Sequence, residues 1–229
     1  MKGSGKCMYT IKEVRDGGYF DFYGENLFYF EAVTEKLLER IAQIEERQKL
    51  LGLRKLCDNV RYRIKSPESM KAKLKKRGFP ETRQSAITNV YDAAGIRIIC
   101  PYLDDVYIIA KEIARQSDIE VLSIKDYIKR PKKNGYRSYH MIVETSVMYM
   151  GETHFVKIEI QIRTMVMNSW ASAEHQLRYK KSKTDGESFD MLKKCAEEMH
   201  TIDRSMMKIR NMMEKTSAEE ACKEAVNRI

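Results

Sequence analysis

Hydrophobic residues recur three and four positions apart early in the chain and predict a long amphipathic helix over residues 25–57, with a break expected at Gly52. Its apolar positions are Leu27, Phe30, Val33, Leu37, Leu38, Ile41, Ile44, Leu50 and Leu51. Residues 1–25 carry glycine and aromatic residues without a clear period, so we expect an irregular arm there. A second helix is expected over residues 66–78, because Pro67 suits the first turn of a helix.

Shorter apolar segments follow and predict a sheet. Strands are expected over residues 95–100, 119–124, 136–147 and 155–163, and helices over 103–116 and from 164 almost to the C-terminus, with an interruption near 183–186. This order predicts an α/β (α+β) fold, a mixed β-sheet of about five strands flanked by helices, with helical N- and C-terminal extensions. The expected division is an irregular arm (1–25), one central domain (26–180) and a C-terminal helical extension (181–229).

The composition is that of a globular protein, 43% hydrophobic and 33% charged, with a formal net charge of +9. This charge favours polyanionic partners such as nucleotides or nucleic acid, without choosing between them. No apolar run suits a transmembrane helix and the first residues do not form a signal-peptide pattern, so we expect a cytoplasmic protein with no membrane partner. Five scattered cysteines without a CxxC pair argue against a disulfide framework or a zinc site.

Residues 156–163 alternate strictly between apolar and polar side chains. The polar face carries Lys157, Glu159, Gln161 and Arg163. By itself this pattern is typical of a half-buried strand with a solvated face. The preceding strand places Tyr136, Ser138 and His140 on one face. If the two strands pair as a hairpin, an aromatic ring, a histidine and a carboxylate share one surface, which suits stacking a base and orienting a proton.

Two clusters of basic residues flank these strands. The first consists of Arg61, Arg63, Lys65, Lys71, Lys73, Lys75, Lys76 and Arg77, and the second of Lys129, Arg130, Lys132 and Lys133. Such clusters are usually solvated surface, but Lys65 and Lys73 are placed to approach phosphates and Arg63 to stack on a base. Contact with RNA or tRNA is a further interpretation of the same charge, although no RNP, KH or zinc-knuckle pattern is present.

Asp92 directly precedes an apolar strand. A carboxylate there can hold Mg²⁺ together with one other acid, although capping a turn is its more ordinary role. The sequence contains no P-loop, Rossmann fingerprint or protein-kinase signature set. A nucleotide site in this chain must therefore rely on arginine, lysine and a metal ion.

Four segments resemble the synthetase domain of the RelA/SpoT family, most of all its short synthetase-only members, the small alarmone synthetases. They are RIKSPESMKAKL (63–74), YDAAGIRIIC (91–100), IKDYIKRPKKNGYRSYH (124–140) and VKIEIQIRTMVMNSWASAEHQLRYK (156–180). They cover about half of the chain in the family's order. The long members hydrolyse their product with an N-terminal HD domain, for which this chain has neither the histidines nor the length, so we expect no hydrolase activity.

The resemblance implies a nucleotidyltransferase-like fold and transfer of the β,γ-pyrophosphate of ATP to the ribose 3′-hydroxyl of GTP or GDP, with release of AMP. By motif, Arg63 and Arg97 match the pair that sandwiches adenine. Lys65 and Lys73 match the lysines that hold the ATP phosphates. Such a reaction is mainly a problem of alignment and charge neutralisation, which cations and a well-placed carboxylate can supply.

The resemblance also assigns the metal and acceptor positions. Asp92 and Glu159 match the Mg²⁺ carboxylates, and Glu159 also matches the base for the attacking hydroxyl. Tyr136 matches the tyrosine that stacks on guanine. The other acceptor-site positions that match are Lys132, His140, Gln161, Asn168 and Glu174.

One departure from the family concerns regulation. Some small synthetases bind their product in a cleft between subunits, through an aromatic residue and a threonine just before the RIK segment. Asn59 and Arg61 stand at those positions here, which argues against product-stimulated allostery. The family's homotetramer, built through terminal helices, is still expected.

Two other functions stay open at this stage. A toxin-type member of the same family would pyrophosphorylate the 3′ end of tRNA or make adenosine alarmones. A non-catalytic RNA-binding protein would use the basic surface alone, with no need for Asp92, Glu159, Arg63, Arg97 and Tyr136 together.

Overall fold

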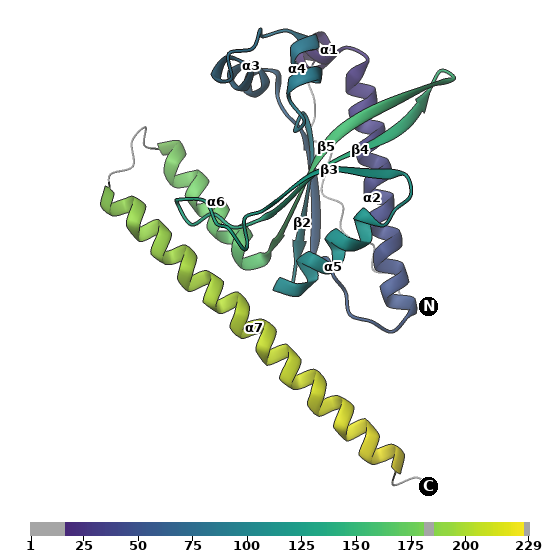
Figure 1. The fold of residues 1–229 in the computed structure, drawn as a ribbon, viewed down its shortest axis with the longest axis vertical. Helices are drawn as coiled ribbons and strands as arrows, with labels where there is room; N and C mark the ends of the chain where they lie inside the picture. The colour runs from purple at the N-terminus through teal and green to yellow at the C-terminus, as the bar shows by residue number, and fades with distance from the viewer. Residues whose placement is uncertain (1–16, 181–185, 227–229) are drawn as a thin grey trace.

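The computed structural model describes residues 17–180 and 186–226 (Figure 1). The helices in these residues are α1 (Gly17–Tyr23), α2 (Asn26–Leu50), α3 (Pro67–Lys76), α4 (Arg83–Asn89), α5 (Leu103–Ala114), α6 (Met165–Lys180) and α7 (Gly186–Val226). The strands are β1 (Asn59–Ile64), β2 (Ala94–Cys100), β3 (Ile119–Asp126), β4 (Tyr139–Tyr149) and β5 (Glu152–Thr164).

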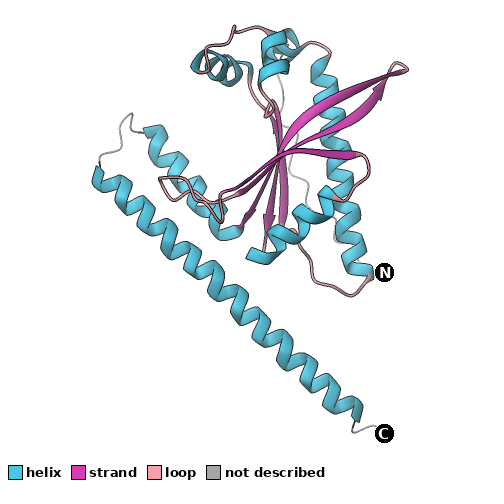
Figure 2. Cartoon of the chain, in the orientation of Figure 1, coloured by secondary structure: helices cyan, strands magenta, loops and turns pink. Residues whose placement is uncertain are grey.

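The strands form one mixed sheet in the order β1-β2-β5-β4-β3. β2 and β5 pair in parallel at its centre, and every other neighbouring pair is antiparallel. β4 and β5 are the predicted hairpin, which turns at Met150 and Gly151, both with positive φ. The predicted fold class, a mixed five-stranded sheet flanked by helices, is confirmed (Figure 2).

The two faces of the sheet differ. α2 and α5 cover one face, and α6 and α7 lie on the other side (Figure 1). The apolar residues of β5 alternate as predicted and are buried, namely Val156, Ile158, Ile160 and Ile162. They pack in one core with the apolar side of α2, and burying each such side chain stabilises the fold by about 1.5–3 kcal/mol. The polar side of the central strands is therefore left to carry the chemistry.

The expectation of an irregular arm is wrong for Gly17–Tyr23, which form α1. A helix of seven residues is too short to show a period, and its aromatic residues serve packing instead. Tyr23 is fully buried, with its ring edge-on to Phe30 at 5.6 Å between centroids. Residues 1–16, and most of the interruption expected near 183–186, lie outside the described residues. The domain boundaries at 26–180 and 181–229 remain predictions.

Besides α1, two further elements, β1 and α4, are absent from the sequence prediction. β1 buries Val60 and Ile64, but Arg61 and Arg63 between them gave the segment the look of a basic surface cluster. α2 stops at Leu50 and the chain turns at Gly52 (φ 67°), where the break was expected. The expected strand from residue 136 begins only at Tyr139.

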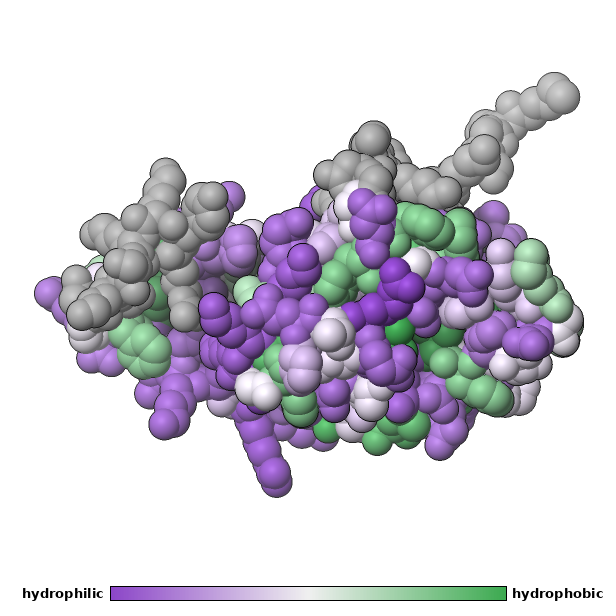
Figure 3. Space-filling model, turned by 90° about the horizontal axis from the view of Figure 1, so that it is seen from above, coloured by the Kyte–Doolittle hydropathy of each residue, from purple (hydrophilic) through white to green (hydrophobic). Residues whose placement is uncertain are grey.

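α7 is attached to the domain by polar contacts along its length. Asp203 accepts a hydrogen bond from Thr164 Oγ1 at 2.8 Å, and the carbonyl of Leu192 accepts one from Trp170 Nε1 at 3.0 Å. Further along, Arg210 pairs with Asp104. No helix in the described part of the chain is long and apolar enough to span a bilayer. On the face shown in Figure 3, hydrophobic residues form separate groups among hydrophilic ones.

Candidate active site

Polar side chains form two rows across the polar face of the sheet, opposite the face that α2 covers. In the first row β1 places Arg61 opposite Arg97 of β2, and Arg97 lies level with Gln161 of β5. β4 continues this row with His140, opposite Gln161. Residues two positions apart on a strand share a face, so the second row lies beside the first. It consists of Arg63, Gly95 and Glu159.

The rows form the floor of an open cleft of about 240 Å³. Its lining residues are Arg61, Tyr62, Arg63, Asp92, Gly95, Ile96, Arg97, Glu159 and Gln161. No ion pair joins the three arginines to a carboxylate in the part of the chain that the structure describes. Burial, together with the nearby guanidinium groups of Arg163 and Arg63, lowers the pKa of Arg97 to about 10. The cleft thus holds positive charge that a bound anion would neutralise.

Asp92 lies between two lysines at the edge of this cleft. Its Oδ2 accepts from Lys73 Nζ of α3 and lies 3.3 Å from Lys65 Nζ, at the end of β1. Burial lowers the pKa of Lys65, and the carboxylate of Asp92 opposes that shift. The other carboxylate oxygen, Asp92 Oδ1, is buried without a hydrogen-bond partner among the described residues. A buried carboxylate oxygen of this kind needs a ligand.

Glu159 belongs to the second row and contacts two residues of the first row. Its Oε1 lies 3.0 Å from His140 Nδ1, and its Oε2 accepts from Gln161 Nε2 at 2.7 Å. Burial alone would raise the pKa of Glu159, but the hydrogen bonds from His140 and Gln161 and the positive charge nearby outweigh it and hold the pKa of Glu159 below its ordinary value. Glu159 is therefore fully ionised near neutral pH.

Asp92 and Glu159 are also the candidate metal ligands. The described residues contain no group of three or more His, Cys, Asp or Glu side chains that could hold a metal by themselves. Mg²⁺ does not need one, because it is usually held by one or two carboxylates and completed by water and phosphate oxygens. Two carboxylates in one cleft, one with an unpartnered oxygen, fit such an ion.

Aromatic and basic groups gather next to Glu159. The Tyr136 hydroxyl lies 2.9 Å from His140 Nε2, and the ring of Tyr127 meets both residues edge-on. Lys132 Nζ lies 4.5 Å from the centre of the Tyr136 ring. Burial lowers the pKa of Lys132, while the negative charges of Glu159 and, more weakly, Glu174 oppose that shift.

α6 contributes the two remaining predicted residues. Glu174 Oε1 accepts from Asn134 Nδ2 at 3.2 Å, which ties α6 to the loop that carries Lys132. Asn168 Oδ1 is buried without a hydrogen-bond partner in the described structure. The structure therefore places the predicted residues in three neighbouring groups, the cleft, the Tyr136–His140 pair and α6.

Comparison with known proteins identifies the family. A model of the region found in RelA / SpoT proteins matches residues 62–184, more than half of the chain. The chain belongs to the RelA/SpoT family. The predicted resemblance is thus confirmed.

Individual relatives of the RelA/SpoT family agree over most of their length. The GTP pyrophosphokinase YwaC of Bacillus subtilis is 34% identical over 185 residues, which are 80% of this chain and 88% of YwaC. The crystal structure of small alarmone synthetase 2 from B. subtilis superposes with a TM-score of 0.74 at 33% identity, covering 82% of this chain and 97% of that one. Small alarmone synthetase 1 from the same organism, bound to its product pppGpp, gives 0.73 at 30% identity, covering 80% and 93%.

The sequence reasoning missed one central residue of this RelA/SpoT-family site. Arg163 is only 5% exposed, and it donates hydrogen bonds to Tyr136, Gln161 and Ser138. Its position on the polar side of the predicted strand was visible, but nothing in the alternation separates a buried arginine from a solvated one. Tyr127 was also missed, because a lone tyrosine in a loop carries no pattern.

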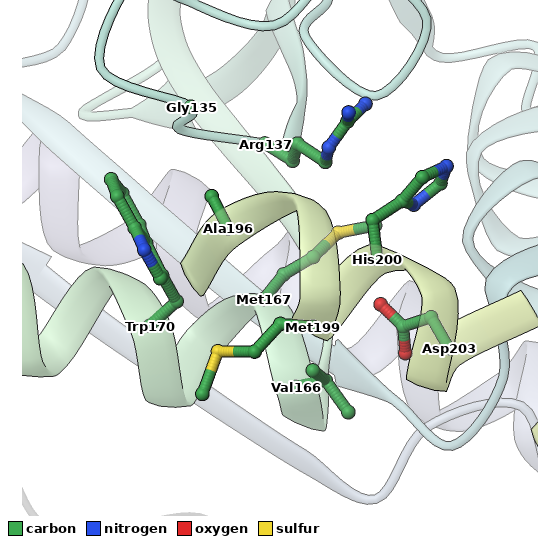
Figure 4. A pocket seen from close by; sticks show the side chains of 9 residues that line it. All are labelled: Gly135, Arg137, Val166, Met167, Trp170, Ala196, Met199, His200 and Asp203. Atoms are coloured by element: carbon green, nitrogen blue, oxygen red, sulfur yellow. The ribbon is translucent and has the colours of Figure 1, made fainter. Parts of the chain in front are cut away.

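A second cavity lies away from the cleft, between α6, α7 and the loop before β4 (Figure 4). Its volume is about 10 Å³, which is room for a water molecule and not for a nucleotide. Arg137 Nε and His200 Nδ1, which are buried without hydrogen-bond partners among the described residues, belong to side chains that line it. This cavity lies where α7 packs against the loop that carries Lys132 and Tyr136, and it is separate from the cleft.

Proposed function

We propose that this chain is an ATP-dependent pyrophosphokinase that transfers the β,γ-pyrophosphate of ATP to the ribose 3′-hydroxyl of GTP or GDP, giving AMP and (p)ppGpp. The observation that carries the proposal is the position of Glu159. On one side of it lies a cleft with three guanidinium groups that form no ion pair among the described residues, and on the other side lies the Tyr136–His140 pair. The relatives named GTP pyrophosphokinase and small alarmone synthetase support the same activity.

On the donor side, Arg63 and Arg97 are proposed to hold the adenine between their planar guanidinium groups. Lys65 and Lys73 lie next to them and are proposed to bind the triphosphate. In the nucleotide-free structure both lysines face Asp92. Asp92 thereby keeps two cations beside the cleft, where an incoming phosphate can recruit them.

On the acceptor side, guanine is proposed to stack on Tyr136. In this structure Lys132 lies over that ring. A stacked base would have to displace Lys132, and the freed ammonium group would then pair with the acceptor phosphates. Gln161, His140, Asn168 and Glu174 are proposed to orient the ribose and the base around it.

In the chemical step the 3′-oxygen forms a bond to the β-phosphorus of ATP, and the bond from that phosphorus to the α–β bridging oxygen breaks. Glu159 accepts the hydrogen bond of the attacking hydroxyl and takes its proton. Because its pKa lies below the ordinary value, Glu159 is a weak base, so the proton moves late, when the new bond to phosphorus has made the hydroxyl acidic. Mg²⁺, held by Asp92 and Glu159, would neutralise phosphate charge and align the two nucleotides.

The test is product identification. Purified protein with ATP, Mg²⁺ and GTP or GDP is expected to form AMP together with pppGpp or ppGpp, resolved by anion-exchange chromatography. Glu159→Gln is expected to lower turnover by about 10²- to 10⁴-fold while binding of a non-hydrolysable ATP analogue without metal changes little. If label from the γ-phosphate of ATP appears only on tRNA or on adenosine nucleotides, the guanine acceptor is wrong. Full turnover in Glu159→Gln would refute the catalytic role.

The homotetramer and the contact with RNA are separate proposals. A homotetramer predicts four times the 26.9 kDa chain mass in solution, measurable by light scattering. A monomer would refute it. Contact with RNA predicts salt-dependent retention of the protein by tRNA, which the same preparation can test.

A further inference from the structure

Arg163 is buried at the end of β5 and has no ion pair in the part of the chain that the structure describes. A buried guanidinium without an acid beside it is unfavourable unless its donors and its charge are satisfied through neighbouring groups. Its Nε donates to Ser138 Oγ at 3.3 Å, and the Ser138 hydroxyl in turn donates to the carbonyl of Ile162. Its Nη2 donates in two directions, and both lead to Glu159.

The first path runs through the acceptor-side aromatic residue. Arg163 Nη2 donates to the Tyr136 hydroxyl oxygen at 2.6 Å. That hydroxyl lies 2.9 Å from His140 Nε2, and His140 Nδ1 lies 3.0 Å from Glu159 Oε1. Tyr136 is held a second way, because the Arg163 guanidinium lies 5.1 Å from the centre of its ring.

The second path is shorter. Arg163 Nη2 also donates to Gln161 Oε1 at 3.0 Å. Gln161 Nε2 donates to Glu159 Oε2 at 2.7 Å. The two paths close a hydrogen-bonded ring of five side chains, Arg163, Tyr136, His140, Glu159 and Gln161.

The ring has one consistent direction. A guanidinium can only donate and an ionised carboxylate can only accept, so Arg163 is the source and Glu159 the end of both paths. The Tyr136 oxygen accepts from Arg163, which leaves its own hydrogen for His140 Nε2. His140 then carries its hydrogen on Nδ1 and donates it to Glu159. The Nδ1–H tautomer of His140 thus satisfies both of its neighbours, and Arg163 sets the direction of the Tyr136 hydroxyl, the orientation of the Gln161 amide and the position of both oxygens of Glu159.

We propose that Arg163 is a positioning residue that couples the acceptor-stacking Tyr136 to Glu159 through this hydrogen-bonded ring. When the acceptor base seats on Tyr136, the hydroxyl of Tyr136 shifts, and the ring passes the shift to the carboxylate that receives the 3′-hydroxyl. Arg163 acts through its neighbours and touches neither nucleotide. The inference rests on the pyrophosphokinase function proposed above.

The sharpest test is Tyr136→Phe, which keeps the ring for stacking and removes only the hydroxyl that links Arg163 to His140. We expect kcat to fall by about 10- to 100-fold, as for other partners that orient a catalytic group, while KM for ATP stays within about twofold. Tyr139→Phe is the matched control, because Tyr139 lies next to His140 on the same strand but faces the opposite side of the sheet. If Tyr136 serves only as a stacking platform, Tyr136→Phe will match wild type and the inference fails.

Arg163→Met and Arg163→Lys probe the source of the ring. Arg163→Met is expected to lower kcat as much as Tyr136→Phe and to raise KM for the acceptor. Arg163→Lys is expected to restore little of this activity, because an ammonium group lacks the planar geometry that bonds Tyr136 and Gln161 at once. The double variant Tyr136→Phe/Arg163→Met should turn over no more slowly than Arg163→Met alone, since both cut the same path. Additive losses would refute the coupling. If Arg163→Met does not fold, Tyr136→Phe still decides the question.

A readout without turnover separates this inference from the proposed function. With ¹⁵N-labelled histidine, the chain's four histidines can be followed by NMR, and His140 is expected to be a single Nδ1–H tautomer in the wild type. Tyr136→Phe removes the hydrogen bond to His140 Nε2, so the Nε2 signal should move toward that of an imidazole nitrogen without a hydrogen bond. Arg163→Met leaves the Tyr136 hydroxyl without its donor and should shift the same signal. A wild-type protein that makes no (p)ppGpp would refute the proposed function by itself. A wild type that turns over, with an unchanged His140 signal in both variants, would refute only the ring.

Discussion

Replacing Gly135 with alanine should damage the acceptor side of the site without touching a nucleotide-binding side chain. Gly135 has φ of 88°, a conformation that L-residues rarely adopt. A Cβ added there would lie 2.6 Å from the Cβ of Ala196 on α7 and 3.3 Å from the Cα of Lys193. The loop that carries Lys132 and Tyr136 therefore packs against α7 with no space for a methyl group.

The magnitude follows from two terms. An alanine in the left-handed region costs about 1–2 kcal/mol, and forcing a methyl into a closed contact costs about 1–3 kcal/mol. A chain of this size loses roughly 2–4 °C of melting temperature per kcal/mol, so Gly135→Ala should melt roughly 5–15 °C lower. Because Lys132 accepts a backbone hydrogen bond from Gly135 at 2.8 Å, displacing Gly135 also moves Lys132, and KM for the acceptor should rise more than KM for ATP.

Ala196→Gly supplies the matched background. It removes the atom that the new methyl group would strike but leaves the backbone strain at residue 135. Gly135→Ala should therefore destabilise the Ala196→Gly protein less than it destabilises the wild type, and the difference measures the clash in a double-mutant cycle followed by urea unfolding. Equal losses in the two backgrounds would mean that the loop does not rest on Ala196, and the reasoning would be refuted.

Two further variants test the supports of the site. Tyr23→Phe removes the hydrogen bond that the buried Tyr23 hydroxyl donates to the Lys65 carbonyl at 2.8 Å. The free energy of unfolding should therefore fall by about 1 kcal/mol, and KM for ATP should rise. If neither quantity changes, α1 does not support Lys65. Burial raises the pKa of Asp203 to about 6, so folding favours the neutral carboxyl over the ionised one. The stability that this preference contributes is present below pH about 4 and is lost as the pH rises through about 6. Asp203→Asn, which can still accept from Thr164, should therefore melt higher than wild type at pH 7.5 with little difference at pH 4; the opposite order would contradict the assignment.

The sequence predicts much of the fold because burial leaves a period. The alternation along β5 and the three-four spacing along α2 each follow from one face packing into the core, and both elements lie where they were expected. β1 escaped prediction because its outward positions are Arg61 and Arg63, which line the cleft, and its only buried residues are Val60 before them and Ile64 after them. Function and packing use alternate residues of the same strand there, and the functional residues dominate the pattern.

The candidate site divides in a similar way. Residues that a nucleotide would contact, such as Arg63 and Glu159, stand in segments whose motifs can be recognised. Arg163 and Gly135 stand in the same segments, but the sequence assigns them no role, because one acts through hydrogen bonds across strands and the other through the close approach of a distant helix. Their roles depend on which segments the fold brings together, which a local pattern does not encode.

The proposed donor and acceptor halves of the site differ in how they are held, and this difference bears on control of the proposed reaction. On the proposed donor side, Asp92 and its two lysines stand on or directly beside β1, β2 and α3, at the edge of the cleft. On the acceptor side, Lys132 and Tyr136 lie on a loop that depends on α6 and α7 for support. A change at α7, such as association with another chain, would therefore reach acceptor binding first and leave ATP binding intact. Ordered loss of the two substrates, acceptor before donor, is the expected result of loosening α7.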